Sequence, residues 1–151
     1  MRPTTSAAAL LVTLFLAACG GGDSPTDPGN NDGNNGGDGN PTTPTVKPDP
    51  SFASDIVPIF SREGCTAGGC HGAPAQAGLT LSSGAYANLV NVASTQTGEL
   101  RVIPGNANDS YLVKKLEGRA SVGARMPQGG QMGATDLTNI KNCINQGAKN
   151  N

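Results

Sequence analysis

The sequence Gly-Cys-Thr-Ala-Gly-Gly-Cys-His-Gly occupies residues 64–72 of the 151-residue chain. Two cysteines, Cys65 and Cys70, are separated by four residues, and His71, the only histidine in the chain, directly follows the second. Thiol and imidazole groups are the soft ligands by which proteins hold many metal ions and metal cofactors. The rest of the sequence is therefore interpreted by asking whether this stretch is a cofactor site or a plainer structural element.

A Cys-x-x-Cys-His pattern is the covalent attachment signature of c-type haem, but the spacer here has four residues instead of two. Such a site needs two thiols that reach the vinyl groups at one edge of the porphyrin and a histidine that ligates the iron. Gly68 and Gly69 suit a longer spacer because glycine adopts strained conformations without steric cost. Taken alone, the stretch therefore fits two interpretations equally: a plainer structural element, or haem thioethers at Cys65 and Cys70 with His71 as the proximal iron ligand.

The first nineteen residues are typical of an export signal. Arg2 supplies a positive charge, and residues 7–18 form an apolar run that is too short to span a bilayer. The run ends in Leu-Ala-Ala-Cys, which resembles the bacterial lipobox, in which the cysteine is lipidated. Residues 1–19 therefore predict a lipoprotein signal peptide with lipidation at Cys19. The expected location is the cell envelope, lipid-anchored and facing the periplasm or the cell exterior.

The next segment, residues 20–50, is rich in Gly, Asn, Asp, Pro and Thr, and its one large apolar side chain is Val46. This composition cannot bury a core and predicts a disordered tether. One folded domain is expected at residues 51–151, where eight basic and six acidic residues give a balance too mild to indicate nucleic-acid binding. The domain has four aromatic residues and no tryptophan, which favours a cofactor or a disulfide, although Leu, Ile and Val side chains can suffice.

The cysteine count leaves alternatives open. With Cys19 lipidated, three cysteines are left, so either two thioethers leave Cys143 over or one disulfide leaves one thiol. A disulfide between Cys143 and Cys65 or Cys70 would remove a haem thiol. A zinc site of Cys65, Cys70 and His71, completed by Cys143, is a third interpretation, which the oxidising surroundings of an exported chain disfavour.

Short helices joined by long loops are predicted across the domain. They are identified by apolar residues at helical spacing, by capping side chains at their starts and by glycines at their ends. The predicted helices, with their expected capping residues, are 51–63 (Ser51 or Asp55), 86–90 (Ser82 or Ser83), 111–117 (Asn108-Asp109-Ser110) and 136–146 (Thr135). The predicted class is therefore all-α, with about four short helices. Loops of this length in a small domain are normally functional.

Iron bound by His71 needs a sixth ligand or an open position, and there is no second histidine. Met126 and Met132 both lie in the predicted loop before the last helix, and either could instead fill a gap in a core. Met126 is followed by Pro127, which stiffens the backbone and so suits a fixed thioether ligand. We therefore expect Met126 as the distal ligand, with Met132 as the fallback. Histidine and methionine together favour electron transfer over O₂ chemistry.

Several short motifs follow the Cys-His stretch in a characteristic order. They are Gly-Leu-Thr-Leu at 78–81, Val-Ile-Pro-Gly-Asn at 102–106, Asp-Ser-Tyr-Leu-Val-Lys-Lys-Leu at 109–116, Arg-Met-Pro at 125–127 and Ile-Asn-Gln-Gly-Ala at 144–148. No single motif is specific, but their order resembles the small cytochrome c domains of the planctomycete-type family over nearly all of residues 52–149. The resemblance implies a small cytochrome c-like fold with one covalent haem c. In it, Cys65 and Cys70 are the thioethers, His71 the proximal ligand and Met126 the distal ligand.

Two features depart from that family: the four-residue spacer, and Cys143 at a position where the family usually has tryptophan. The same resemblance suggests that the carbonyl of Pro104 accepts a hydrogen bond from His71 and orients its ring. Cys143 is then interpreted either as a small buried apolar residue or as a disulfide partner.

The resulting functional expectation is a membrane-tethered monohaem cytochrome c that carries single electrons between redox protein partners. No paired carboxylates, second histidine or serine elbow indicates an enzyme, and no small-molecule substrate is inferred. The alternative is a disulfide-stabilised, non-redox interaction lipoprotein without haem. Five basic residues are interpreted either as a docking rim for partners or as a mixed solvated surface: Arg101, Lys114, Lys115, Arg119 and Arg125.

Overall fold

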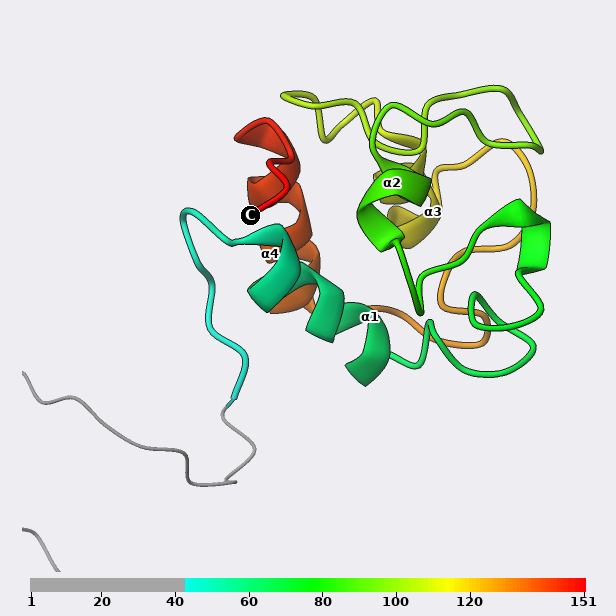
Figure 1. Cartoon of the computed structure of the whole chain (residues 1–151), viewed down its shortest axis with the longest axis horizontal. Helices are drawn as coiled ribbons and strands as arrows, with labels where there is room; N and C mark the ends of the chain where they lie inside the picture. The colour runs from blue at the N-terminus through cyan, green and yellow to red at the C-terminus, as the bar shows by residue number, and fades with distance from the viewer. Residues whose placement is uncertain (1–42) are drawn as a thin grey trace, which may run out of the picture. The chain divides into compact units, whose positions relative to one another are not determined.

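The computed structural model describes residues 43–151 (Figure 1), so the predicted signal peptide, the lipidation site Cys19 and tether residues 20–42 lie outside the described part. Regular structure in residues 43–151 is helical, and extended segments there meet only in isolated bridges such as the one between Val90 and Val102. The prediction of an all-α domain is thus confirmed at the level of class. The helical elements are η1 (Phe52–Ile56), α1 (Val57–Arg62), η2 (Gln76–Gly78), α2 (Ala85–Leu89), α3 (Tyr111–Glu117) and α4 (Ala134–Asn145).

The first predicted helix is divided into a π-helical turn, η1, and the short helix α1. Ser51 caps η1 as expected, because its hydroxyl accepts a hydrogen bond from the amide of Ser54 at 3.4 Å. Pro58 stands in the first turn of α1 and has no amide hydrogen to donate. In the π turn before it, each backbone amide donates to the carbonyl five residues earlier: Ile56 donates to Ser51, and Val57 donates to Phe52. The chain therefore stays helical up to the proline.

The apolar core lies where η1 and α3 pack against α4, and α1 continues directly from η1, as Figure 1 shows. Arg62, at the end of α1, forms an ion pair of 2.6 Å with the buried Asp136 in the first turn of α4. The largest fully buried apolar side chains come from these helices, from α2 and from the extended segment that contains Val102: Phe60, Ile56, Ile59, Leu89, Ile140, Val102 and Val113. Apolar spacing predicts a stripe of Leu137, Ile140 and Cys143 with Ile144 on the last helix. Its last three residues are buried, and Leu137 is partly buried against the core.

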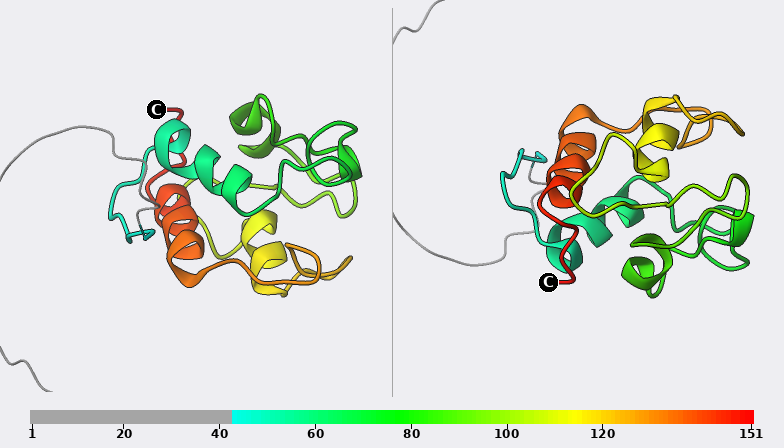
Figure 2. Two further views of the ribbon diagram at one scale, coloured as in Figure 1. Left: turned by 90° about the horizontal axis from the view of Figure 1, so that it is seen from below. Right: turned by 90° about the horizontal axis from the view of Figure 1, so that it is seen from above.

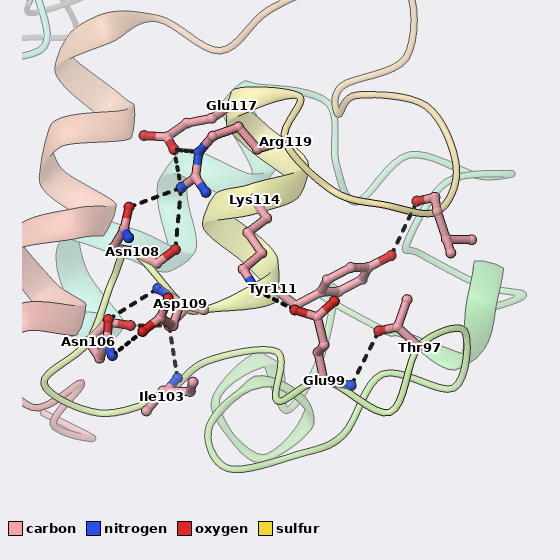
Figure 3. A network of polar contacts seen from close by, with 12 residues as sticks. Thr97, Glu99, Ile103, Asn106, Asn108, Asp109, Tyr111, Lys114, Glu117 and Arg119 are labelled. Carbon is pink, nitrogen blue, oxygen red and sulfur yellow. Dashed lines mark hydrogen bonds and ion pairs between the residues drawn. The ribbon is translucent and has the colours of Figure 1, made fainter.

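Helix α3 matches its predicted range, but its capping differs from the prediction. The hydroxyl of Ser110 makes no capping bond; it accepts from the amide of Ile103 at 2.9 Å and donates to the carbonyl of Asn106 at 2.7 Å. The first amides of α3 instead donate to the carbonyls of residues 100 and 101, at 3.0 and 2.9 Å. Figure 3 shows a further tie between α3 and this segment, the ion pair of Lys114 with Glu99. The carbonyl groups of an extended segment, and not a capping side chain, therefore accept hydrogen bonds from the first amides of α3.

Two other capping predictions are wrong. Gly84, and not Ser82 or Ser83, is the residue before α2, and it has φ = +61°, a left-handed conformation that glycine adopts without strain. Helix α4 starts after Gly133, so Thr135 lies inside its first turn instead of capping it. In both cases a flexible glycine, and not a hydroxyl side chain, makes the turn into the helix.

The end of the expected tether packs against α4. Asn139 accepts a hydrogen bond from the amide of Lys47 at 2.7 Å and donates to the carbonyl of Thr45 at 2.9 Å. Asn142 donates to the carbonyl of Lys47 at 2.7 Å, and Gln146 reaches the carbonyl of residue 48. These side chains lie along one face of α4. We call residues 45–48 the N-terminal strap. Because they bond to α4, the domain includes residues before its predicted start at residue 51. No helix within residues 43–151 is long and apolar enough to cross a membrane.

Candidate functional site

A cavity of about 440 Å³ lies among the loops that follow α1 and that join α3 to α4. Figure 2 shows that both loops lie on the side of the domain away from the C-terminus. The cavity is lined by all five residues that were predicted to attach haem or bind its iron: Cys65, Cys70, His71, Met126 and Met132. Its volume falls within the range of about 300–1,000 Å³ that is typical of ligand and cofactor sites.

The end of α1 delivers the first thiol to this cavity. Gly64 takes φ = +72° and turns the chain out of the helix, while the amide of Cys65 still donates to the carbonyl of Phe60 at 2.8 Å. The amide of His71 then donates back to the carbonyl of Cys65 at 2.9 Å. This hydrogen bond joins the two ends of the motif loop, so the cysteines and the histidine occupy one compact loop. Of the two spacer glycines, Gly69 has a positive φ of +82°, and Gly68 does not.

Gly72, the residue after the histidine, is required by a close backbone approach that the sequence analysis missed. A Cβ atom at this position would lie 2.4 Å from the carbonyl oxygen of Thr66 and 3.1 Å from that of Ala67. Atoms that are not bonded cannot approach so closely, so any side chain at residue 72 would force the loop open. The only signal in the sequence was the glycine itself, directly after the histidine.

One nitrogen of the His71 ring is fixed by a backbone carbonyl. Nδ1 lies 3.2 Å from the carbonyl oxygen of Leu79, and since a carbonyl can only accept, Nδ1 carries the proton. Nε2 is then the nitrogen with a free lone pair, which suits it to bind a metal. The prediction that Pro104 supplies this carbonyl is wrong. The turn at residues 104–105 is bonded instead to the C-terminal part of α4, where the amide of Gly105 donates to Ile144 at 2.7 Å.

The two methionines are held in different ways. Met132 is 2% exposed and belongs to the apolar core, although it also reaches the cavity wall. Met126 is half-buried at the edge of that core, and its amide donates to the carbonyl of Lys115 at 2.9 Å. The neighbouring Arg125 donates from Nε to the carbonyl of Leu116 at 2.9 Å. Met126 therefore has a fixed backbone and a thioether that is less enclosed by protein than that of Met132.

The basic residues do not form the free rim that one interpretation expected. Lys115 is buried, contrary to the outward position expected for it, and its ammonium donates to the carbonyls of Val122 and Ala124 in the methionine loop. Arg101 is also buried, at 7% exposure. Lys114 pairs with Glu99, Arg119 pairs with Glu117, and Arg125 is bonded to Leu116 and Gln131. These cations therefore hold the cavity loops and α3 in place.

The cysteines within residues 43–151 are all free thiols: Cys65 half-buried, Cys70 exposed and Cys143 buried. Burial raises the pKa of the Cys65 thiol, and the nearby charge of Glu63 raises it further. Burial likewise raises the pKa of Cys143, which packs in the apolar core as a small hydrophobic side chain. Neither disulfide considered for Cys143 is formed. Within the same residues, no three His, Cys, Asp or Glu side chains are grouped as a metal site would need.

An acidic residue at the cavity edge also went unnoticed in the sequence. Glu63 lines the cavity directly before the motif loop. Burial raises the pKa of its carboxyl group, and so does Asp136, whose carboxylate accepts a hydrogen bond from the protonated Glu63 and repels its charged form. The ion pair of Asp136 with Arg62 lies beside it. The link between α1 and α4 therefore reaches the wall of the cavity.

The chain matches no family model, and no curated protein or solved structure is significantly similar to it. The chemical capacity of the site is therefore judged from the residues around the cavity. They offer two thiols five positions apart, an imidazole with one nitrogen anchored, and a thioether on a separate loop.

Proposed function

We propose that residues 43–151 form the haem domain of a monohaem c-type cytochrome with a small cytochrome c-like fold, which carries single electrons between redox proteins. Cys65 and Cys70 are its thioether attachment residues, His71 is the proximal iron ligand and Met126 the distal one. The observation that carries the proposal is the convergence of these four residues on one cavity. Cys65, Cys70 and His71 are close in the sequence, whereas Met126 is reached only after η2, α2 and α3.

The donor set of this cavity suits haem c. Two thiols that are not paired with each other are available for attachment, and His71 keeps Nε2 free because Nδ1 is bonded to Leu79. The other walls are largely apolar, with Leu79, Leu81 and Leu89 among them. An apolar wall suits a porphyrin plane and keeps water from the iron, which raises the reduction potential. When bound, haem supplies a one-electron couple, and the protein's side chains supply ligation, orientation and burial.

The methionine loop gives the reason for proposing a carrier and not an enzyme. Met126 sits on a backbone that is fastened to α3 by its own amide and by Arg125. A thioether held in this way would serve as a second protein ligand to a haem iron, and iron ligated by both His71 and Met126 would have no open position for O₂ or a substrate. Single electrons passing to and from protein partners are the function that this arrangement best serves.

The N-terminal part of the proposal rests on the sequence. Lipidation at Cys19 and a tether that begins at residue 20 and ends before the N-terminal strap would keep the domain attached to a membrane of the cell envelope, facing the periplasm or the exterior. Export also brings the chain to the compartment in which its thiols would meet haem. The partners are accordingly redox proteins in the same compartment.

The alternative of a disulfide-stabilised interaction lipoprotein requires a bond among Cys65, Cys70 and Cys143. All three are free thiols, and Cys143 is 4% exposed within the core. The free thiols favour haem attachment over a structural disulfide.

A test of the proposal is to export the full chain in a bacterium that attaches haem c and to stain a denaturing gel for haem. We expect covalent haem and a sharp reduced α band in the visible spectrum. Cys143→Ala is the matched control: it should keep the haem, whereas Cys65→Ala or Cys70→Ala should lower haem retention sharply. A colourless protein whose Cys143→Ala variant changes mobility on a non-reducing gel would instead establish the disulfide alternative.

A further inference from the structure

Residues 77–80, which we call the histidine-anchoring segment, have an unusual set of hydrogen bonds. Each of its four consecutive carbonyl groups accepts a bond from a side chain elsewhere in the chain. The pairs are Thr95 Oγ1 with Ala77 at 2.9 Å, Arg101 Nη2 with Gly78 at 3.1 Å, His71 Nδ1 with Leu79 at 3.2 Å and Asn88 Nδ2 with Thr80 at 3.0 Å. The segment therefore contains Leu79, whose carbonyl accepts the hydrogen bond from His71, and the carbonyls on either side of Leu79 are bonded to Arg101 and Asn88.

The segment needs this support because its own backbone gives it little. Ala77 and Gly78 have φ angles of +52° and +64°, in the left-handed region, and the chain then becomes extended at Leu79. It pairs with no strand, so its carbonyls have no regular backbone ladder to bond to. The position of the Leu79 carbonyl therefore depends on the side chains that hold its neighbours.

Arg101 is the strongest of these supports. It is 7% exposed, and its guanidinium bonds two carbonyls at once, Gly78 through Nη2 at 3.1 Å and Asn88 through Nη1 at 2.9 Å. Its own amide donates to Val92 at 2.8 Å, so the backbone that carries it is fixed as well. Bonds from a charged donor are about twice as strong as neutral ones, and the rigid fork of arginine sets two directions together.

We infer that Arg101 is a positioning residue for His71: by holding the Gly78 carbonyl, it keeps the adjacent Leu79 carbonyl on Nδ1 and so fixes Nε2 toward the cavity. The redox consequence of this inference rests on the proposed function. A histidine that donates Nδ1–H to a carbonyl is a stronger metal ligand. A ligand that donates more electron density stabilises oxidised iron, so weakening the hydrogen bond from His71 Nδ1 to Leu79 raises the reduction potential.

Arg101→Lys is the decisive variant, because it retains the positive charge but loses the fork that bonds two carbonyls. In the haem-bearing full chain, we expect a higher reduction potential than in the wild type, with haem content unchanged. A tenfold change in the ratio of oxidised to reduced protein at a fixed electrode potential corresponds to about 59 mV for a one-electron couple. Arg119→Lys is the matched control, since Arg119 pairs with Glu117 and Asn108 and bonds nothing in the segment. It should not shift the potential.

A second readout follows the histidine itself. His71 is the only histidine, so its ring signals in a ¹H–¹⁵N spectrum need no assignment among alternatives. In the reduced, diamagnetic protein, the Nδ1 proton should exchange slowly with water in the wild type and faster in Arg101→Lys. If the exported protein carries no haem, the same spectrum reports the tautomer. Loss of the Nδ1–H tautomer in the variant would then support the inference although the proposed function had failed.

The measurements on Arg101→Lys distinguish a failure of this inference from a failure of the haem proposal. An unchanged potential together with unchanged exchange of the Nδ1 proton in Arg101→Lys would overturn the inference while leaving the haem proposal intact. Should Arg101→Lys fail to fold, Thr95→Val replaces it, because Thr95 is exposed and contributes one bond to the same segment. That variant should shift the potential in the same direction by a smaller amount, and no shift would again overturn the inference.

Discussion

The helical framework, made of η1, α1, α3 and α4, and the cavity loops, residues 63–81 and 118–133, are stabilised in different ways. In the framework, apolar side chains such as Ile56, Phe60 and Ile140 pack against one another. In the cavity loops, backbone carbonyls accept bonds from buried cations and amides, and glycines take left-handed turns. Apolar burial is non-directional, whereas hydrogen bonds fix direction. The loops are therefore the part of the molecule in which the position of each donor atom is controlled.

The sharpest test of this contrast is the pair of methionines in the loop of residues 118–133, since Met132 packs into the apolar core with the framework helices and Met126 lies at the cavity edge. Met132→Ala should lower the free energy of unfolding by about 2–5 kcal/mol, because it leaves a void in a packed interior. Met126→Ala should cost far less stability. It should remove the weak methionine-to-iron charge-transfer band and lower the reduction potential. Chemical denaturation and the visible spectrum measure the two effects.

The reverse pattern would break the contrast. If Met132→Ala abolished the charge-transfer band and Met126→Ala kept it, the core methionine would be the ligand and the distal assignment would be wrong. Both variants should keep covalent haem, because neither methionine takes part in attachment. Loss of stainable haem in either one would point to misfolding and not to a lost ligand.

Gly72 tests whether the motif loop depends on its backbone closure. Gly72→Ala would place a Cβ 2.4 Å from the Thr66 carbonyl oxygen, and crowding of this kind costs about 1–3 kcal/mol. We expect a lower unfolding midpoint and reduced haem attachment. Gly68→Ala is the matched control in the same loop, since nothing lies within 4 Å of a Cβ there and its φ is not positive. Equal behaviour of the two variants on a haem-stained gel would contradict the role given to Gly72.

How far the sequence predicts this molecule follows from the same contrast. Helical spacing and glycine stops predicted α3 within its observed range and the buried stripe of α4, because apolar burial leaves a periodic pattern. The cysteine spacing and the Met-Pro pair predicted residues that meet in one cavity. The Leu79 partner of His71 could not be predicted, since any residue has a carbonyl and only the fold selects one.

The helix caps and the positions of two basic residues also could not be predicted from the sequence. Gly133 and Gly84, not hydroxyl side chains, precede the helices, and the carbonyls of residues 100 and 101 close α3. Arg101 and Lys115 were expected on the surface because charged residues usually are. Their burial follows from carbonyl groups in loops that a sequence does not place in space.

The N-terminal strap is a part of the framework that is held by hydrogen bonds instead of apolar packing, because it bonds to side chains of α4. Asn139→Ala removes both of its bonds to the strap and leaves the amide of Lys47 without that partner, so we expect a loss of about 1–2 kcal/mol. Asn142→Ala removes one exposed bond and should cost less than half as much. Limited proteolysis near residue 45 should accelerate in Asn139→Ala. If it does not, the strap is held by something other than Asn139.

The smallest expected effect concerns the ion pairs that join α3 to α4. Glu117 accepts bonds from Lys141 at 2.8 Å and from Arg119 at 2.7 Å, and the bond from Lys141 in particular lowers the pKa of its carboxyl group below the usual 4.5. A carboxyl group with a lowered pKa in the folded state stabilises the fold above its unfolded pKa. That contribution is lost as the pH falls through the folded value. At neutral pH, Glu117→Gln should therefore cost about 0.5 kcal/mol, a typical value for a partly exposed pair.

The pH dependence of the difference between wild type and Glu117→Gln separates this contribution from others. Glu63 has a raised pKa, so its contribution runs in the opposite direction, but it is common to both proteins and cancels in the difference. The difference in unfolding free energy should be largest near neutral pH and shrink toward zero well below pH 4.5. Asp49→Asn, an exposed site outside the ion pairs of residues 43–151, should show no such trend. A deficit in Glu117→Gln that persisted at low pH would mean that packing between α3 and α4, and not charge, holds that contact.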